Sequence, residues 1–164
     1  MPCRPIHADF THRAVEGKNK VTRARILLAD DHKEMRDKVA RLLAPEFDVV
    51  GAVLDGQALL KADLELRPDV CVIDISMPII GGIDAASELK ASGSRAAIVF
   101  LTVHEDPDFV QAALKAGALG YVLKSRLATE LCPAIRGALA GRLFISPSTK
   151  LGAKARTPLS SPPN

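Results

Sequence analysis

Residues 70–82 read VCVIDISMPIIGG, a short apolar run that ends in an acid and is followed by Pro78 and two glycines. Four consecutive apolar residues are typical of a strand that is buried on both faces, as in a parallel sheet. Proline and glycine then break the strand before a helix that we predict over 85–90. This stretch therefore predicts one strand–helix unit, with Asp74 at the carboxyl end of the strand.

The same unit occurs five times along the chain. The predicted strands cover 25–29, 47–53, 70–73, 96–101 and 119–123, and the predicted helices cover 35–43, 58–66, 85–90, 107–115 and 129–139. Apolar strands that alternate with helices form a parallel sheet with right-handed crossovers. We therefore expect an α/β fold, a doubly wound five-stranded parallel sheet with helices on both faces.

The composition fits one globular domain and excludes several classes of protein. The chain has 164 residues, of which 48% are hydrophobic and 25% are charged, enough for one good core. No apolar run approaches the roughly 18 residues of a membrane helix, and the start lacks the apolar stretch of a signal peptide. We therefore expect a cytoplasmic protein with no membrane partner. The three cysteines form no C-x-x-C pair and indicate neither a disulfide framework nor a zinc site.

The net charge of +3 is unevenly distributed. Residues 1–25 and residues 142–164 each carry +4, whereas residues 26–141 carry −5. We interpret 1–23 as a basic disordered N-terminal extension, 24–146 as the folded domain, and 147–164 as a disordered tail rich in Pro and Ser. Basic tails can attract nucleic acid, but these contain no base-reading motif, so we expect no direct DNA binding by this chain.

Five polar residues stand at the ends of the predicted strands. Each is ordinary alone, because an acid after a strand is commonly a helix cap and a lysine is commonly a solvated surface residue. In a parallel sheet, however, the carboxyl ends of the strands meet at one edge, where ligands bind. We therefore expect the five side chains to converge: Asp30, Asp31, Asp74, Thr102 and Lys124.

The three carboxylates in this set predict a metal site. Carboxylates brought together raise one another's pKa unless a cation lies among them, and hard oxygen ligands suit Mg²⁺. Beside a metal, an ionised aspartate can accept a phosphoryl group as an acyl phosphate. The metal, Lys124 and the Thr102 hydroxyl would then balance the charge that develops during the transfer.

Four segments carry a family resemblance: ILLADDHKEMR, DVCVIDISMPIIGGIDAA, AAIVFLTVHED and ALKAGALGYVLKS. On these motifs the chain resembles the response-regulator receiver family of two-component signalling over 24–146. The resemblance implies a flavodoxin-like sheet with the strand order 2-1-3-4-5. It also implies a signalling phosphoacceptor rather than an enzyme, one that catalyses only its own phosphorylation and dephosphorylation.

The resemblance gives a role to each matching position. Asp74 becomes the phosphoacceptor, and Thr102 and Lys124 bind the phosphoryl oxygens. The implied Mg²⁺ ligands are Asp31 directly, Asp30 through water, Asp74 itself, and the backbone carbonyl of Ser76.

Two further positions concern the switch. Tyr121 matches the family's switch aromatic, which turns inward when Thr102 moves toward the phosphate. His104 lies at a rim position that tunes the lifetime of the phosphate, and an exposed loop histidine without a role is an equal alternative. The signalling face is expected over 106–140, in the fourth helix, the fifth strand and the last helix. The other histidines, His7, His12 and His32, show no metal spacing and are interpreted as surface residues.

The implied partners are a histidine kinase or phosphotransfer protein as phosphodonor, an unknown downstream protein, and a second copy in a phosphorylation-dependent homodimer through 109–136. GYVLKS and GRLFISP are most similar to the LuxR-type subgroup, whose members continue into a helix-turn-helix domain. Ser125 stands where many receivers have a proline. Only 18 residues follow Ser146, so we expect the DNA-binding domain to be missing from this chain.

Two other interpretations within the family stay open: a truncated LuxR-type transcriptional regulator and a non-phosphorylated pseudo-receiver adaptor. The complete set of strand-end residues argues against lost chemistry. A haloacid-dehalogenase-type phosphatase also uses a strand-end aspartate with Mg²⁺. It requires a second acid two residues later, where this chain has Ser76.

Overall fold

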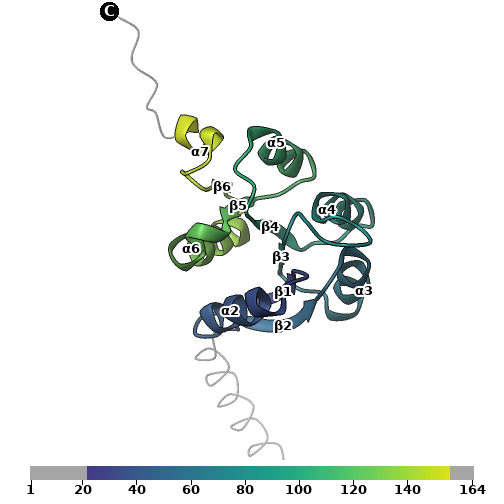
Figure 1. The fold of residues 1–164 in the computed structure, drawn as a ribbon. Helices are drawn as coiled ribbons and strands as arrows, with labels where there is room; N and C mark the ends of the chain where they lie inside the picture. Colours follow the sequence, from purple (N-terminus) through teal and green to yellow (C-terminus); the bar gives the residue numbers. More distant parts are fainter. Residues whose placement is uncertain (1–21, 156–164) are drawn as a thin grey trace, which may run out of the picture.

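The computed structural model describes residues 22–155, which form a six-stranded parallel sheet in the order β2-β1-β3-β4-β5-β6 (Figure 1). The strands are β1 (Arg25–Ala29), β2 (Asp48–Val53), β3 (Val70–Ile73), β4 (Ala97–Thr102), β5 (Gly120–Leu123) and β6 (Phe144–Ile145). The helices are α2 (Lys33–Leu43), α3 (Gly56–Leu66), α4 (Gly82–Ala91), α5 (Pro107–Lys115), α6 (Leu127–Leu139) and α7 (Lys150–Ala155), with a 3-10 turn η1 (Lys124–Arg126) before α6. The predicted order 2-1-3-4-5 is confirmed, with one strand added beside β5.

Side chains of the strands alternate between two apolar cores, one on each face of the sheet. Leu27 and Phe100 pack with α3, α4 and α5 on one face, whereas Ile26 and Val99 pack with α2 and α6 on the other. Figure 1 shows these helices on the two sides of the sheet. All four residues of β3 are buried, Cys71 among them, so the strand that precedes Asp74 lies in the centre of the molecule.

N-cap residues determine where the loops at the carboxyl edge of the sheet end and where α5 and α3 begin. Asp106 caps α5, because its Oδ1 accepts the Asp108 N–H at 2.8 Å, and Pro107 occupies the first helical position, where no N–H is needed. Asp55 caps α3 in the same way, accepting the Ala58 N–H at 2.8 Å. These loops frame the edge of the sheet at which the polar residues meet.

The C-terminal part differs from the prediction. We predicted disorder from residue 147, but residues 150–155 form α7, and Phe144 and Ile145 extend the sheet as β6. So short a strand and helix depend on packing against their neighbours rather than on their own propensity, and composition does not reveal such packing. Residues 1–21 and 156–164, with the remaining predicted disorder and with Cys3, His7 and His12, lie outside the described residues.

Among residues 22–155, no helix is both long enough and apolar enough to cross a membrane.

Candidate functional site

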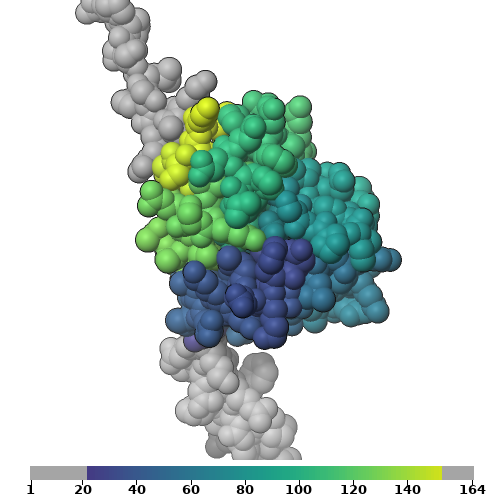
Figure 2. Space-filling model, viewed as in Figure 1, coloured from purple at the N-terminus to yellow at the C-terminus, as the bar shows by residue number. Residues whose placement is uncertain are grey.

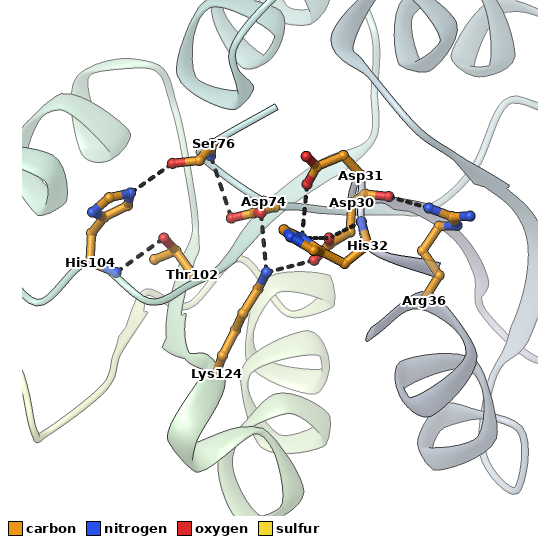
Figure 3. A network of polar contacts seen from close by, with 9 residues as sticks. All are labelled: Asp30, Asp31, His32, Arg36, Asp74, Ser76, Thr102, His104 and Lys124. Carbon is orange, nitrogen blue, oxygen red and sulfur yellow. Dashed lines mark hydrogen bonds and ion pairs between the residues drawn. The ribbon is translucent and has the colours of Figure 1, made fainter. Parts of the chain in front are cut away.

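The carboxyl ends of β1, β3 and β4 and the residue after β5 meet at one edge of the sheet, and Figure 3 shows the polar side chains that gather there. Lys124 links the strands, because its Nζ lies 2.7 Å from Asp30 Oδ2 and 3.1 Å from Asp74 Oδ2. The side chains of Lys124, Asp30 and Asp74 are only 11%, 9% and 5% exposed. One ammonium group therefore bridges two buried carboxylates.

Burial governs the electrostatics of Asp74. Removal from water raises the pKa of its carboxyl group, and the charge of Lys124 offsets this only in part. Burial alone would lower the pKa of Lys124, but its bonds to Asp30 and Asp74 outweigh burial and raise that pKa. The ammonium group is thus well compensated while Asp74 is not, and a further cation would stabilise the ionised form of Asp74.

Asp31 and His32 extend the cluster toward solvent. One possible ligand atom from each of Asp30, Asp31, His32 and Asp74 lies within 4.8 Å of the others. The side chain of Asp31 is 34% exposed, and His32 Nδ1 lies 3.0 Å from Asp31 Oδ1 and 3.2 Å from Asp30 Oδ1. Three carboxylates with one open side form an oxygen-rich ligand set of the kind that Mg²⁺ prefers.

The loop after β3 connects the cluster to the loop after β4. The Ser76 N–H points at Asp74 Oδ1 across 3.4 Å, and Ser76 Oγ lies 2.8 Å from His104 Nε2. The His104 ring also stacks on Phe109 of α5, with ring centroids 4.1 Å apart. The side chain of His104 therefore spans from the loop after β3 to α5.

The backbone of His104 connects Thr102 with Tyr121. Thr102 Oγ1 accepts the His104 N–H at 3.2 Å, and the Tyr121 hydroxyl donates to the His104 carbonyl oxygen at 2.7 Å. Both side chains are fully buried, and burial raises the pKa of the Tyr121 phenol. Tyr121 is therefore turned inward and hydrogen-bonded to the loop that follows Thr102. The inward position that the resemblance associates with movement of Thr102 is thus present here while Thr102 is bonded to His104.

The backbone after Asp74 is closely fitted. A Cβ on Gly82 would collide with the Asp74 carbonyl oxygen, so glycine allows α4 to begin directly against the end of β3. Ile79 has a φ of 70°, and the Pro78 carbonyl accepts the Ile80 N–H at 2.9 Å across it. This is a γ-turn with positive φ, which is strained for a β-branched residue. The Ile79 side chain is nevertheless 74% exposed, so packing does not explain the strain.

The structure places the predicted metal and phosphoryl ligands and His104 at this one edge (Figure 3), whereas Tyr121 lies within β5 and reaches the following loop through its hydroxyl. Asp30, Asp74 and Lys124 are in direct contact, whereas the Thr102 hydroxyl is bonded to His104. Sequence reasoning missed two participants. His32 was interpreted as a plain surface residue, and its ring is exposed but contacts two carboxylates. Arg36 donates to the Asp30 carbonyl oxygen at 2.7 Å. The one available signal was the position of His32 directly after the paired acids.

Comparison with known proteins agrees with this geometry. Residues 26–136 match the family described as the response regulator receiver domain. The chain belongs to this family. It is the receiver domain of a two-component response regulator, and the family supports a phosphoacceptor role.

Two curated relatives illustrate the match. The chain is 38% identical over 125 residues to the uncharacterized transcriptional regulatory protein YvfU of Bacillus subtilis (strain 168), covering 75% of this chain and 62% of YvfU. It is 40% identical over 125 residues to the response regulator GacA of Pseudomonas viridiflava, covering 75% of this chain and 58% of GacA. The receiver thus spans about three fifths of the length of these relatives.

Solved structures show the same fold. A LuxR-family two-component response regulator from Aurantimonas sp. SI85-9A1 matches with a TM-score of 0.76 and 36% identity, covering 82% of this chain and 99% of that one. The isolated receiver of RcsB from Salmonella enterica serovar Typhimurium, solved with the phosphomimetic BeF3−, matches with a TM-score of 0.73 and 27% identity, covering 79% and 98%.

Proposed function

We propose that this receiver is a switch in which Asp74 accepts a phosphoryl group from a histidine kinase or a phosphotransfer protein. The observation that carries the proposal is the burial of Asp74 beside Lys124, with the carboxylates of Asp30 and Asp31 close by. In the transfer, a carboxylate oxygen of Asp74 bonds to phosphorus while the donor's P–N bond breaks. Phosphorylation and its reversal are the only reactions that we assign to the domain.

The donor set suits Mg²⁺, which receiver domains bind at an acidic pocket. We assign the ion to Asp31 directly, Asp30 through water, Asp74, and the backbone carbonyl of Ser76. Bound there, Mg²⁺ would neutralise charge on the phosphoryl oxygens. Burial raises the pKa of Asp74 even beside Lys124, and this supports the assignment, because added positive charge is what the carboxylate lacks.

Lys124 and Thr102 are assigned to the phosphoryl oxygens, and Tyr121 to the readout. Phosphorylation adds a charge of roughly −1.5 to −2, which attracts the ammonium group and the Thr102 hydroxyl. Thr102 Oγ1 now accepts the His104 N–H. Its movement would free that N–H, and Tyr121, bonded to the other side of the same residue, would respond. A bistable loop of this kind can pass a local charge to a distant surface.

His104 is assigned to tuning the lifetime of the phosphate. Its ring bonds to Ser76 and stacks on Phe109, and so stands at the rim of the site. We expect His104→Ala to shorten the half-life of the phosphoprotein severalfold, because the ring limits access of water to the acyl phosphate. Val103→Ala is the matched control, since Val103 is adjacent and 67% exposed. Equal half-lives in the two variants would leave His104 without this role.

We further propose a cytoplasmic location, a downstream protein partner contacted through the 106–140 face, and a phosphorylation-dependent homodimer through 109–136. The GacA relative is named a response regulator and YvfU a transcriptional regulatory protein, which supports an output that phosphorylation controls. The complete set of Asp30, Asp31, Asp74, Thr102 and Lys124 argues against a pseudo-receiver.

Intact mass after incubation with acetyl phosphate tests the proposal. We expect a gain of one phosphoryl group that requires Mg²⁺ and is absent in Asp74→Asn. Asp69→Asn is a suitable control, because Asp69 precedes the other end of β3. An equal gain in Asp74→Asn, or none in the wild type under any condition, would contradict the proposal.

A further inference from the structure

The last described segment of the chain lies along the edge of β5. We call residues 144–152 the C-terminal strap, and they comprise β6, the following turn and the start of α7. The Phe144 N–H donates to the Leu119 carbonyl oxygen at 2.9 Å, and the Ser146 N–H donates to that of Tyr121 at 2.8 Å. The strap therefore extends the sheet beside the strand that carries Tyr121. Figure 2 shows the C-terminal residues, in yellow, against the green surfaces of α5 and α6.

Side chains fix the strap to the domain. Ser146 is fully buried, and its hydroxyl bonds to the Glu130 carboxylate on α6. Thr149 is 1% exposed; its hydroxyl donates to the Ser146 carbonyl oxygen at 2.8 Å and accepts the Gly152 N–H at 2.9 Å. Leu151 packs on the core beneath α5. The strap is thus a fitted part of the domain.

A path of hydrogen bonds joins the strap to the phosphoacceptor site. Thr102 contacts the His104 N–H, and Tyr121 contacts the His104 carbonyl oxygen. The carbonyl oxygen of Tyr121 in turn accepts from Ser146. Tyr121 is therefore bonded through its side chain to the loop beside the site and through its backbone to the strap.

We propose that the strap occupies part of the signalling face assigned above, the edge of β5 with the adjoining sides of α5 and α6, in the unphosphorylated state. Phosphorylation of Asp74 releases the strap through Thr102, His104 and Tyr121. Release frees the backbone groups of β5, which are then open to strand pairing. The inference rests on the proposed phosphoryl transfer to Asp74.

A small change in free energy is enough to release the strap from the domain. A two-residue strand and a six-residue helix are too short to be stable alone. They depend on their contacts with Tyr121, Glu130 and the core. Segments of this kind open locally while the remainder stays folded. A tenfold change in the open population corresponds to only about 1.4 kcal/mol, which a displaced buried hydrogen bond can supply.

Hydrogen–deuterium exchange on the full chain tests the inference. The protein is incubated with Mg²⁺, with or without acetyl phosphate, and the intact mass of each sample reports whether it is phosphorylated. We expect strap amides to exchange about tenfold faster in the phosphorylated protein, with no change in Asp74→Asn. Phosphorylation with unchanged or slower strap exchange would overturn the inference and leave the proposed function standing. Absence of phosphorylation would overturn both.

A variant of Gly152 tests directly whether the strap covers the edge of β5. A Cβ on Gly152 would collide with the Ser146 carbonyl oxygen, so Gly152→Ala should displace the strap without touching the site. We expect the strap amides of the unphosphorylated variant to exchange as fast as those of the phosphorylated wild type. With acetyl phosphate and Mg²⁺, the variant should still gain one phosphoryl group. Gly137→Ala is the control, because its added Cβ would lie 3.6 Å from the Arg142 carbonyl oxygen, an ordinary contact. If the strap amides of unphosphorylated Gly152→Ala exchanged as slowly as those of the unphosphorylated wild type, the strap would not lie on the edge of β5 as proposed, and the inference would be overturned.

Discussion

Lys124→Met removes the charge that bridges Asp30 and Asp74 while keeping most of the volume of the side chain. The Lys124 Nζ contacts both carboxylates, at 2.7 and 3.1 Å, and all three side chains are nearly buried. Removing one partner of a buried ion pair costs about 3–5 kcal/mol, because the charge that remains is uncompensated. Asp31 is one-third exposed and opens the cluster to water on one side, which favours the lower end of that range, about 3 kcal/mol.

Urea unfolding at pH 7 without Mg²⁺ measures this loss, and a thermal melt should show a fall of roughly 10 °C. Lys33→Met is the matched control. It removes an ion pair with Asp37 in which both side chains are more than half exposed, and such exposed pairs contribute little to stability because solvent screens them.

The loss should shrink with Mg²⁺, which replaces the missing charge. It should also shrink toward about pH 4. Without Lys124 the folded-state pKa of Asp74 rises further above its unfolded value, so the folded protein binds more protons as the pH falls and regains stability. A loss no larger than that of Lys33→Met, or one that neither Mg²⁺ nor acid reduces, would show that Lys124 does not compensate two buried carboxylates.

Further variants test the acceptor loop and the switch. Ile79→Gly should stabilise the protein by about 0.5–1 kcal/mol, because it relieves the strained turn and removes few contacts; a loss of stability in urea would contradict this. Tyr121→Phe should cost about 1 kcal/mol, since its hydroxyl bonds to the His104 carbonyl oxygen, and an unchanged urea midpoint would count against that bond. Gly82→Ala should cost more than about 2 kcal/mol and slow labelling by acetyl phosphate, whereas normal labelling would show that α4 can shift away from Asp74. Without Mg²⁺, wild-type stability should fall as the pH rises from about 4 through the raised pKa of Asp74; Asp74→Asn should show a flatter profile, and parallel profiles would contradict the burial argument.

The sheet order and the position of the site could be predicted because both follow from local patterns. Each buried strand is a continuous apolar run, and parallel strands place the residues after them at one edge. Asp74 and Lys124 could therefore be brought together across 50 positions of sequence without any knowledge of side-chain contacts.

The features that escaped prediction depend on tertiary contacts. The strap contains no long apolar run, and its buried Ser146 and Thr149 are typical of a loop by composition. His32 gains its contacts only when the loop after β1 turns, with the Asp30 side chain accepting the His32 N–H at 2.9 Å. The positive φ of Ile79 runs against its residue type. In each case packing or loop geometry overrides the preference of the individual residue.

Reductive trapping shows directly which residue carries the phosphoryl group, which we expect to be Asp74. Borohydride reduces an acyl phosphate to an alcohol, so a phosphorylated aspartate becomes homoserine, which peptide mass mapping can locate. Wild-type protein labelled with acetyl phosphate and Mg²⁺ should yield homoserine at position 74, and Asp74→Asn should yield none. Homoserine at the position of another aspartate, or a phosphorylated protein without homoserine at position 74, would show that Asp74 is not the phosphoacceptor.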